Sequence, residues 1–389
     1  MDVSITFSFF LIFTGAAIFA SLALATRQPL IIAYIALGAC IGPHGASLVT
    51  DTQLLAEIGH IGIIFLLFLL GLDMQPQALW TTLRKSTVVA LASSIVFLAM
   101  GFAVTRLFGF SMIDALVVGA AMMFSSTIIG IKLLPTTVLH HKHIGELMIG
   151  LLLLQDLLAI VVLMVLFSAA ADSGNMGRDL AVSLLGLPLL GGAALVTVRF
   201  VLLPLIARFD RFHEYIFLLA LGWCLGMAEA AKALGLSEEI GAFIAGITIA
   251  TSPISQYIAV NLKPLRDFFL ILFFFAVGAR FDLAMLELVW MPALVLAVLV
   301  LVVKPVTYRF LLKGVSEKRI LAWDLGFRLG QASEFSLLIA YVAAGAALIS
   351  SEASLLIQAT TIITLLASSY IVVMNYPNPI AVSDRLRRD

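Results

Sequence analysis

The stretch "LLLLQDLLAIVV", residues 151–162, places Gln155 and Asp156 inside a segment that is otherwise apolar enough to span a bilayer. The whole chain is 62% hydrophobic and 12% charged, with a mean hydropathy of +1.13. Soluble domains contain roughly half apolar and about a quarter charged residues. The composition therefore predicts an all-α polytopic membrane protein, and the net charge of zero gives no indication of a nucleic-acid partner.

The apolar segments are long enough to predict a many-helix membrane domain, since one crossing needs about 20 residues. They predict about 13 helices, near residues 4–25, 29–48, 54–72, 86–108, 112–134, 144–170, 180–205, 214–233, 239–258, 266–284, 288–312, 321–347 and 352–375. The Lys and Arg residues of the connecting loops lie mostly on one side of this arrangement. Because cationic loops remain cytoplasmic, we expect the N-terminus outside and the C-terminus inside.

The two halves of the sequence resemble each other when one is shifted by about 207 residues, which brings Gly71 onto Gly278 and Ser126 onto Ser333. Because the seventh span crosses alone, the two six-helix repeats are inverted, an arrangement typical of transporters. We expect one transmembrane antiporter domain over residues 1–375, followed by a cytoplasmic tail over 376–389. The domain would consist of repeat one (about 1–171), a linker helix (about 180–205) and repeat two (about 212–375).

Asp156 is the most informative residue of the chain because it lies near the middle of its predicted span. A carboxylate at that depth costs about 2.5–3.5 kcal/mol on insertion scales, so an ionisable group there indicates function. The alternative is a protonated Asp that forms an interhelical hydrogen bond, worth about 0.6 kcal/mol. The neighbouring Gln155 offers an uncharged carbonyl oxygen. A single titrating anion favours one monovalent cation or one proton at a time.

Two polar islands interrupt the fifth and twelfth predicted spans. Ser125, Ser126 and Thr127 form the first, and Gln331 and Ser333 belong to the second. We expect helices to break at these islands, since freed carbonyls and half-helix ends can face an ion. Small residues that allow close helix packing are the structural alternative.

Three further charged residues fall within predicted spans. Lys304 is a candidate charge partner of Asp156, although its stem could also carry the ammonium to the membrane surface. Arg328 and Glu334 are six residues apart, so they do not share a face of a regular helix. A break between them could bring them together in a charge network, or each could pair elsewhere.

Several motifs together resemble one family. They are "LGACIGPHG", "LFLLGLDMQPQALW", "FSSTIIG", "LLLLQDLLAIVVL", "FIAGITIATS", "LFFFAVGARFDL" and "LGQASEFSLLI". From about residue 5 to residue 375 the chain is similar to the membrane domain of the monovalent cation:proton antiporter-2 family, closest to Kef-type potassium efflux systems. Arg280 and Arg328 depart from this pattern, because they stand where the family has uncharged residues.

The resemblance implies a sodium/proton antiporter-like fold with two crossed, broken helices, a homodimer and alternating access. It assigns proton and cation binding to Asp156, Gln155, Ser125, Ser126 and Thr127, and the membrane lysine to Lys304. Gln331, Ser333, Glu334 and Arg328 would form the crossover and its charge network. The chain lacks a glycine-rich dinucleotide fingerprint, so we expect no cofactor in it. Either the cytosolic nucleotide-binding domain or subunit of Kef systems is missing from this chain, or the chain is a standalone exchanger.

These observations predict a potassium or sodium ion/proton antiporter of the bacterial inner membrane, which is a transporter and not an enzyme. Its substrates would be the monovalent cation at Asp156 and the proton. A sodium-coupled symporter of an organic anion on the same architecture is one alternative. A channel-like or sensing membrane subunit, in which the buried charges are structural, is another.

Overall fold

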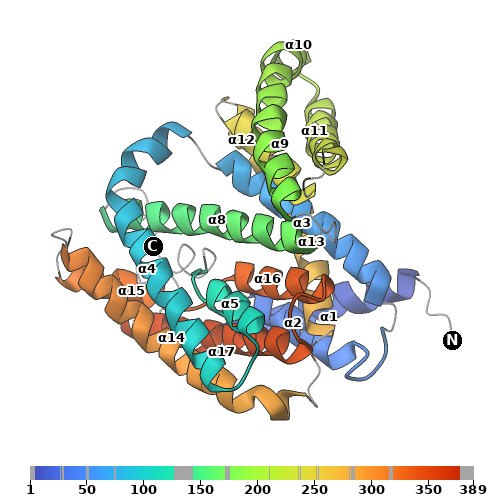
Figure 1. Ribbon diagram of the computed structural model, residues 1–389. Coiled ribbons are helices and arrows are strands. Elements are labelled where there is room, and N and C mark those ends of the chain that lie inside the picture. Colours follow the sequence, from blue (N-terminus) through green and yellow to red (C-terminus); the bar gives the residue numbers. More distant parts are fainter. Residues whose placement is uncertain are drawn as a thin grey trace. The chain divides into compact units, whose positions relative to one another are not determined.

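The computed structural model describes residues 5–26, 28, 30–49, 52–73, 76–126, 143–170, 176–209, 211–234, 236, 238–250, 252, 254–279, 281, 285–314 and 319–376 (Figure 1). Every regular element in these ranges is helical, as the sequence predicts. Thr127, Arg280 and the predicted tail after Tyr376 lie outside the described residues.

The helices are α1 (Ile5–Ala25), α2 (Leu30–Ile41), α3 (Thr52–Asp73), α4 (Pro76–Leu107), α5 (Met112–Ala121), α8 (His143–Ala170), α9 (Met176–Thr197), η1 (Val198–Leu202), α10 (Leu203–Arg208), α11 (His213–Ala233), α12 (Glu238–Ala250), α13 (Ile254–Ala279), α14 (Leu286–Gly314), α15 (Arg319–Arg328), α16 (Glu334–Gly345) and α17 (Ser351–Asn375). Six helices among the described residues are long and apolar enough to cross a membrane, and further apolar helices are shorter. The chain is a multi-pass membrane protein.

The seventh predicted span is one continuous helical path with a π-helical turn in its middle. Pro204 follows this turn and has no N–H to give to a carbonyl one turn earlier. The N–H of Leu203 reaches back five residues to the carbonyl of Val198. The missing donor explains why the backbone hydrogen bonds at Val198–Leu202 span five residues and not four. This π-bulge cannot be read from the hydropathy pattern.

Two predicted spans are broken. α5 ends at Ala121, and Met122–Ser126 are not helical. Residues 127–142 lie outside the described part of the chain. The twelfth span consists of α15 and α16, separated by Leu329–Ser333. Residues 330–333 are the island that predicts this break. We call the two non-helical segments, Met122–Ser126 and Leu329–Ser333, the crossover.

The chain divides into two compact units, and each contains pieces from both halves of the sequence. One unit comprises residues 1–48, 80–166 and 277–389, and the other comprises 49–79 and 167–276. In the second unit α3 packs closely on α12, where Phe68 and neighbouring apolar residues form a buried cluster. In the first unit Phe97, Leu151, Tyr308 and Leu325 belong to a buried cluster that joins α4, α8, α14 and α15.

Matching glycine contacts support the repeat. A methyl group on Gly71 of α3 would lie 2.5 Å from the carbonyl oxygen of Phe243 in α12. A methyl group on Gly278 of α13 would lie 2.0 Å from the carbonyl oxygen of Ile35 in α2. Gly278 follows Gly71 by 207 residues, and Phe243 follows Ile35 by 208, so the two contacts are equivalent under the sequence shift. Each repeat therefore uses a glycine to bring two backbones together.

Candidate ion-binding site

The two halves of the crossover are joined by direct hydrogen bonds. The hydroxyl of Ser125 donates to the carbonyl of Leu329 across 2.8 Å. The amide of Gln331 donates to the carbonyl of Ser126 across 3.5 Å. Both bonds satisfy carbonyls that the breaks released from helical pairing, a condition for irregular backbone at membrane depth. The structure thus brings the two predicted islands together.

Gln155 fixes the crossover to α8. Its Oε1 accepts from the backbone N–H of Ser125 at 3.0 Å, and its Nε2 donates to the hydroxyl of Tyr308 at 2.7 Å. The Gln155 oxygen is therefore engaged by the backbone in this conformation. The side chain links α8, the crossover and α14, and in doing so it positions the residue that follows it.

Lys304 is completely buried in α14 and its ammonium is held by the crossover. Nζ donates to the carbonyl of Phe124 at 2.6 Å, to the carbonyl of Gln331 at 2.9 Å and to the hydroxyl of Ser125 at 3.3 Å. It also lies 5.1 Å from the ring centroid of Phe97. Three acceptors match the three donors of an ammonium group, so the side chain does not extend to the membrane surface.

Asp156 lies midway along the 28-residue helix α8 and its side chain is 2% exposed. Within the described part of the chain, no ion pair joins it to Lys304. Its acidic neighbour is Glu334, which is buried and close enough to interact electrostatically with Asp156. Glu334 itself accepts from the hydroxyl of Ser333 at 3.3 Å. Two carboxyl groups therefore belong to this site.

The N-terminus of α16 gives Glu334 a favourable position. Ser333 caps the helix, accepting from the N–H of Phe335, and the hydroxyl of Ser336 accepts from the N–H of Ser333. A carboxylate in the first turn of a helix interacts favourably with the helix dipole. The break that precedes α16 thus creates a capped helix end whose first residues are buried.

A comparison of the sequence with protein families decides the class of this chain. Residues 9–374 match the family described as sodium/hydrogen exchanger, transmembrane. The chain belongs to this family. Among its relatives, the iron transporter MagA of Paramagnetospirillum magneticum is 28% identical over 88% of this chain and 79% of its own length. The glutathione-regulated potassium-efflux system protein KefC of Cronobacter sakazakii is 32% identical over 88% of this chain and 56% of its own length.

A solved structure shows the same fold. The sodium proton antiporter MjNhaP1 from Methanocaldococcus jannaschii superimposes with a TM-score of 0.70 at 20% identity, covering 93% of this chain and 94% of that one. The antiporter-like fold and the resemblance to potassium efflux antiporters are confirmed. This chain spans 56–61% of the length of the potassium efflux relatives that it matches.

Arg328 contributes to a cluster at the end of α15. Its Nε donates to the carboxylate of Asp324 at 2.7 Å, and its guanidinium lies 5.9 Å from the ring centroid of Tyr376. Burial, together with the charge of Asp324, raises the pKa of Tyr376 above its usual value, and the charge of Arg328 opposes this shift. One partner of Arg328, Asp324, thus lies one turn earlier in the same helix.

Sequence reasoning missed several side chains that support the crossover. Tyr308 holds Gln155, and Ser336 donates to the carbonyl of Ala121 at 2.6 Å. Thr364 and Ser368 of α17 contact the second crossover segment. The spacing of four residues between Lys304 and Tyr308 places both on one face of α14, a signal that could have identified Tyr308.

Proposed function

We propose that this chain exchanges a monovalent cation, with potassium the first candidate and sodium the second, for a proton across the membrane. The observation that carries the proposal is the burial of Asp156 in the middle of α8, directly after the residue that holds the crossover. An ionisable group at such depth marks an ion or proton pathway.

In the proposed cycle, a proton and a cation compete for the Asp156 carboxylate. Oxygen atoms of Ser125, Ser126 and Thr127 complete the coordination of the cation, since alkali ions bind carbonyl and hydroxyl oxygens. Lys304 supplies the compensating positive charge when Asp156 is ionised and carries no cation. Alternating access then exposes the site to one side of the membrane at a time.

One exchanging carboxyl group gives one proton for one cation, without net charge movement. In this scheme Asp156 alone exchanges the proton, and its acidic neighbour Glu334 takes no part in the exchange. If Glu334 also bound and released a proton during the cycle, transport would move net charge. An imposed membrane potential therefore distinguishes the two stoichiometries.

The choice of potassium rests on the names of the relatives, which include KefC and plant K(+) efflux antiporters. Iron, named for the relative MagA, is a weaker candidate. The described part of the chain contains no group of three or more His, Cys, Asp or Glu side chains that could hold a metal ion. Transition metals favour imidazole and thiolate ligands, whereas the crossover offers hydroxyl and carbonyl oxygens.

We further propose that the protein is a homodimer in a bacterial inner membrane, with its N-terminus outside and its C-terminus in the cytoplasm. The loop charges support this orientation. Control by a cytosolic domain or subunit belongs to the same proposal, because the chain matches little more than half of the length of its potassium efflux relatives.

The test is cation-driven proton movement in proteoliposomes that contain a pH-sensitive dye. Potassium should dissipate a pH gradient with the wild-type protein and with Asp267→Asn, a change at an exposed carboxylate. Asp156→Asn should abolish the response. Persistent exchange in Asp156→Asn would overturn the assignment of the site, and potassium, sodium and ferrous ions in parallel identify the cation.

The same assay separates the remaining alternatives. Flux of an organic anion that requires sodium and moves no protons would indicate a symporter. Flux that rises without saturation as the cation concentration increases would indicate a channel. An exchanger should saturate, because each turnover requires a conformational change.

A further inference from the structure

The last helix, α17, carries a stripe of polar side chains through the protein interior. Ser354, Gln358, Thr361, Thr364 and Ser368 recur every three or four residues, so they share one face of the helix. All five are buried. We call this set the α17 stripe. Small residues such as Ser and Thr also allow close packing of membrane helices, so a function for the stripe depends on what lies at its ends and on its unpaired groups.

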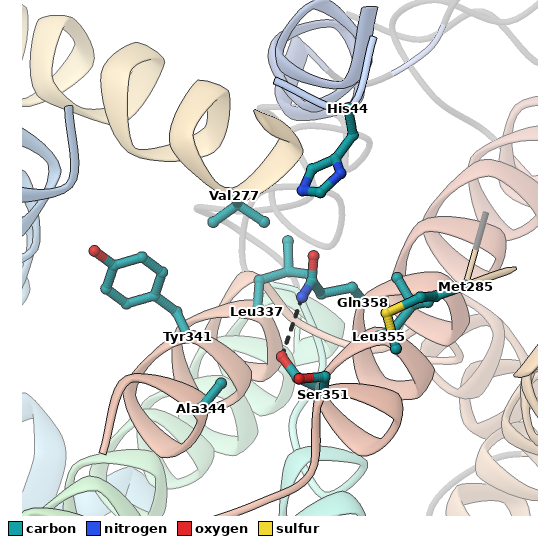
Figure 2. Close-up of a pocket in the computed structure, with 10 residues that line it drawn as sticks. His44, Val277, Met285, Leu337, Tyr341, Ala344, Ser351, Leu355 and Gln358 are labelled. Carbon is teal, nitrogen blue, oxygen red and sulfur yellow. Dashed lines mark hydrogen bonds between the residues drawn. The ribbon is translucent and has the colours of Figure 1, made fainter. Parts of the chain in front are cut away.

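One end of the stripe opens into a cavity of about 320 Å³. Ser354 and Gln358 line this cavity together with His44, Leu337 and Tyr341. Figure 2 shows the Gln358 side chain reaching into the cavity below His44. Its Nε2 donates to the hydroxyl of Ser354 at 3.2 Å. A water molecule takes up about 30 Å³ in the liquid, so the cavity has room for several.

The other end of the stripe reaches the crossover. The hydroxyl of Thr364 accepts from the backbone N–H of Ala332 at 3.1 Å. The hydroxyl of Ser368 donates to Oε1 of Gln331 at 2.8 Å. The backbone carbonyl of Gln331 in turn accepts a hydrogen bond from Nζ of Lys304. The stripe therefore connects the cavity with the residues that hold the candidate ion site.

Three oxygen atoms of α17 have no hydrogen-bond partner in the described structure: Gln358 Oε1 and Thr361 Oγ1 of the stripe, and Thr360 Oγ1 next to it. Gln358 is 8% exposed and both threonines are completely buried. A hydroxyl within a helix commonly donates to a carbonyl of the preceding turn, as Ser369 does to Leu365 at 2.8 Å. Leaving a buried polar group unpaired costs about 1–3 kcal/mol, and ordered water commonly satisfies such groups.

We propose that the α17 stripe and the adjoining cavity form a water-filled path along which the transported monovalent ion passes between the α16–α17 end of the protein and the crossover. Hydroxyl groups can both donate to and accept from water, and uncharged oxygens can replace part of the hydration shell of a cation without trapping it. The inference rests on the proposed exchange function. The orientation proposed above makes this the outer path.

The first experiment replaces Thr361 by Val, which keeps the shape and removes the hydroxyl. If the path carries ions, the exchange rate of Thr361→Val falls severalfold. If the hydroxyl is only an unpaired buried group, the variant becomes more stable and exchange is unchanged, which overturns the proposal. Ser369→Ala is the matched control, because Ser369 is buried in the same helix but bonds to its own backbone. Gln358→Leu repeats the test if Thr361→Val fails to fold.

The second experiment asks directly whether water and ions reach position 361. Thr361→Cys is placed in a background in which the native cysteines are replaced, Cys40→Ser and Cys224→Ala. Silver ions, which are monovalent and bind thiols, should block later labelling of the new cysteine by a maleimide after detergent denaturation. Ser369→Cys should stay protected from silver. Protection of both positions overturns the proposal.

This labelling does not depend on turnover, so it also works in the Asp156→Asn background. Loss of exchange in Asp156→Asn together with silver access to position 361 supports both proposals. Continued exchange in Asp156→Asn with silver access contradicts only the proposed function. Protection from silver while Asp156→Asn abolishes exchange contradicts only the path along α17.

Discussion

The ammonium of Lys304 donates to the carbonyl of Phe124 across 2.6 Å, and the same group donates to the carbonyl of Gln331 across 2.9 Å. These carbonyls belong to the two different segments of the crossover. A single side-chain nitrogen thus joins both broken helices at the point where their backbones lack helical partners. Lys304 is therefore positioned to stabilise the crossover.

We predict that Lys304→Met lowers the stability of the protein. Methionine has a similar length but no donor, so two buried carbonyls lose a partner, at about 1–3 kcal/mol for each. The melting temperature in detergent should fall clearly. Lys313→Met is the control, since Lys313 is exposed near the end of the same helix. An unchanged melting temperature for Lys304→Met would mean that water replaces the ammonium without loss.

Small ammonium ions extend this prediction. Lys304→Ala removes the whole stem and leaves the acceptors of Phe124 and Gln331 in place. Methylammonium should raise the melting temperature of this variant and leave that of the wild type unchanged, because a ligand that binds only the folded state stabilises it. Tetramethylammonium, which has no N–H donor, provides the comparison and should have no such effect.

We predict that Tyr308→Phe destabilises the protein and slows exchange, because it removes a hydrogen bond that orients the Gln155 side chain. The change removes the hydroxyl that accepts from Gln155 Nε2 at 2.7 Å and leaves a buried donor unpaired. Stability should fall by about 1–3 kcal/mol, and exchange should slow because Gln155 positions both Ser125 and Asp156. Tyr215→Phe keeps its ring contact with Phe209 at 5.1 Å and should leave both quantities unchanged. Normal exchange in Tyr308→Phe would show that Gln155 needs no support from α14.

The sequence could identify the broken helix and the buried acid, because both leave local signals. Gly330 and its polar neighbours interrupt an apolar run, and Asp156 stands alone among leucines. The acceptors of Lys304 leave no such signal. They are backbone carbonyls of Phe124 and Gln331, and a carbonyl is present at every residue, so only the folded path of the chain selects these two.

The proximity of Glu334 to Asp156 was also beyond the sequence. Helical spacing rules apply within one regular helix, whereas Glu334 begins a new helix after the break. Because residues Leu329–Ser333 are not helical, the spacing between Arg328 and Glu334 does not predict which side chains lie near either of them. The hydroxyls of Thr364 and Ser368 were missed for a related reason, since serine and threonine are common in membrane helices and become informative only when their partners are known.

We predict that two glycines tolerate no side chain because they carry the packing of the repeats. Gly71→Ala and Gly278→Ala each force a methyl group against a backbone carbonyl, at 2.5 Å and 2.0 Å. Overpacking of this kind costs about 1–3 kcal/mol, so both variants should melt earlier. Gly222→Ala, in α11, has no atom within 4 Å of the added methyl group. It should be neutral or slightly stabilising, since alanine favours helix over glycine. Equal melting temperatures for all three variants would contradict the close helix contacts.

We predict an asymmetry between the two members of the Asp324–Arg328 pair. The side chain of Arg328 is 1% exposed, whereas that of Asp324 is 23% exposed. Asp324→Asn leaves a buried guanidinium with a weaker acceptor, and breaking a buried pair in this way costs about 3–5 kcal/mol. Arg328→Gln leaves a carboxylate that water can reach, so its loss should be smaller. Melting temperatures of both variants and of the double variant test this, because the double variant should recover part of the loss of Asp324→Asn. A larger loss for Arg328→Gln than for Asp324→Asn would show that the stacking of Arg328 near Tyr376, rather than its pairing with Asp324, dominates the contribution of this residue.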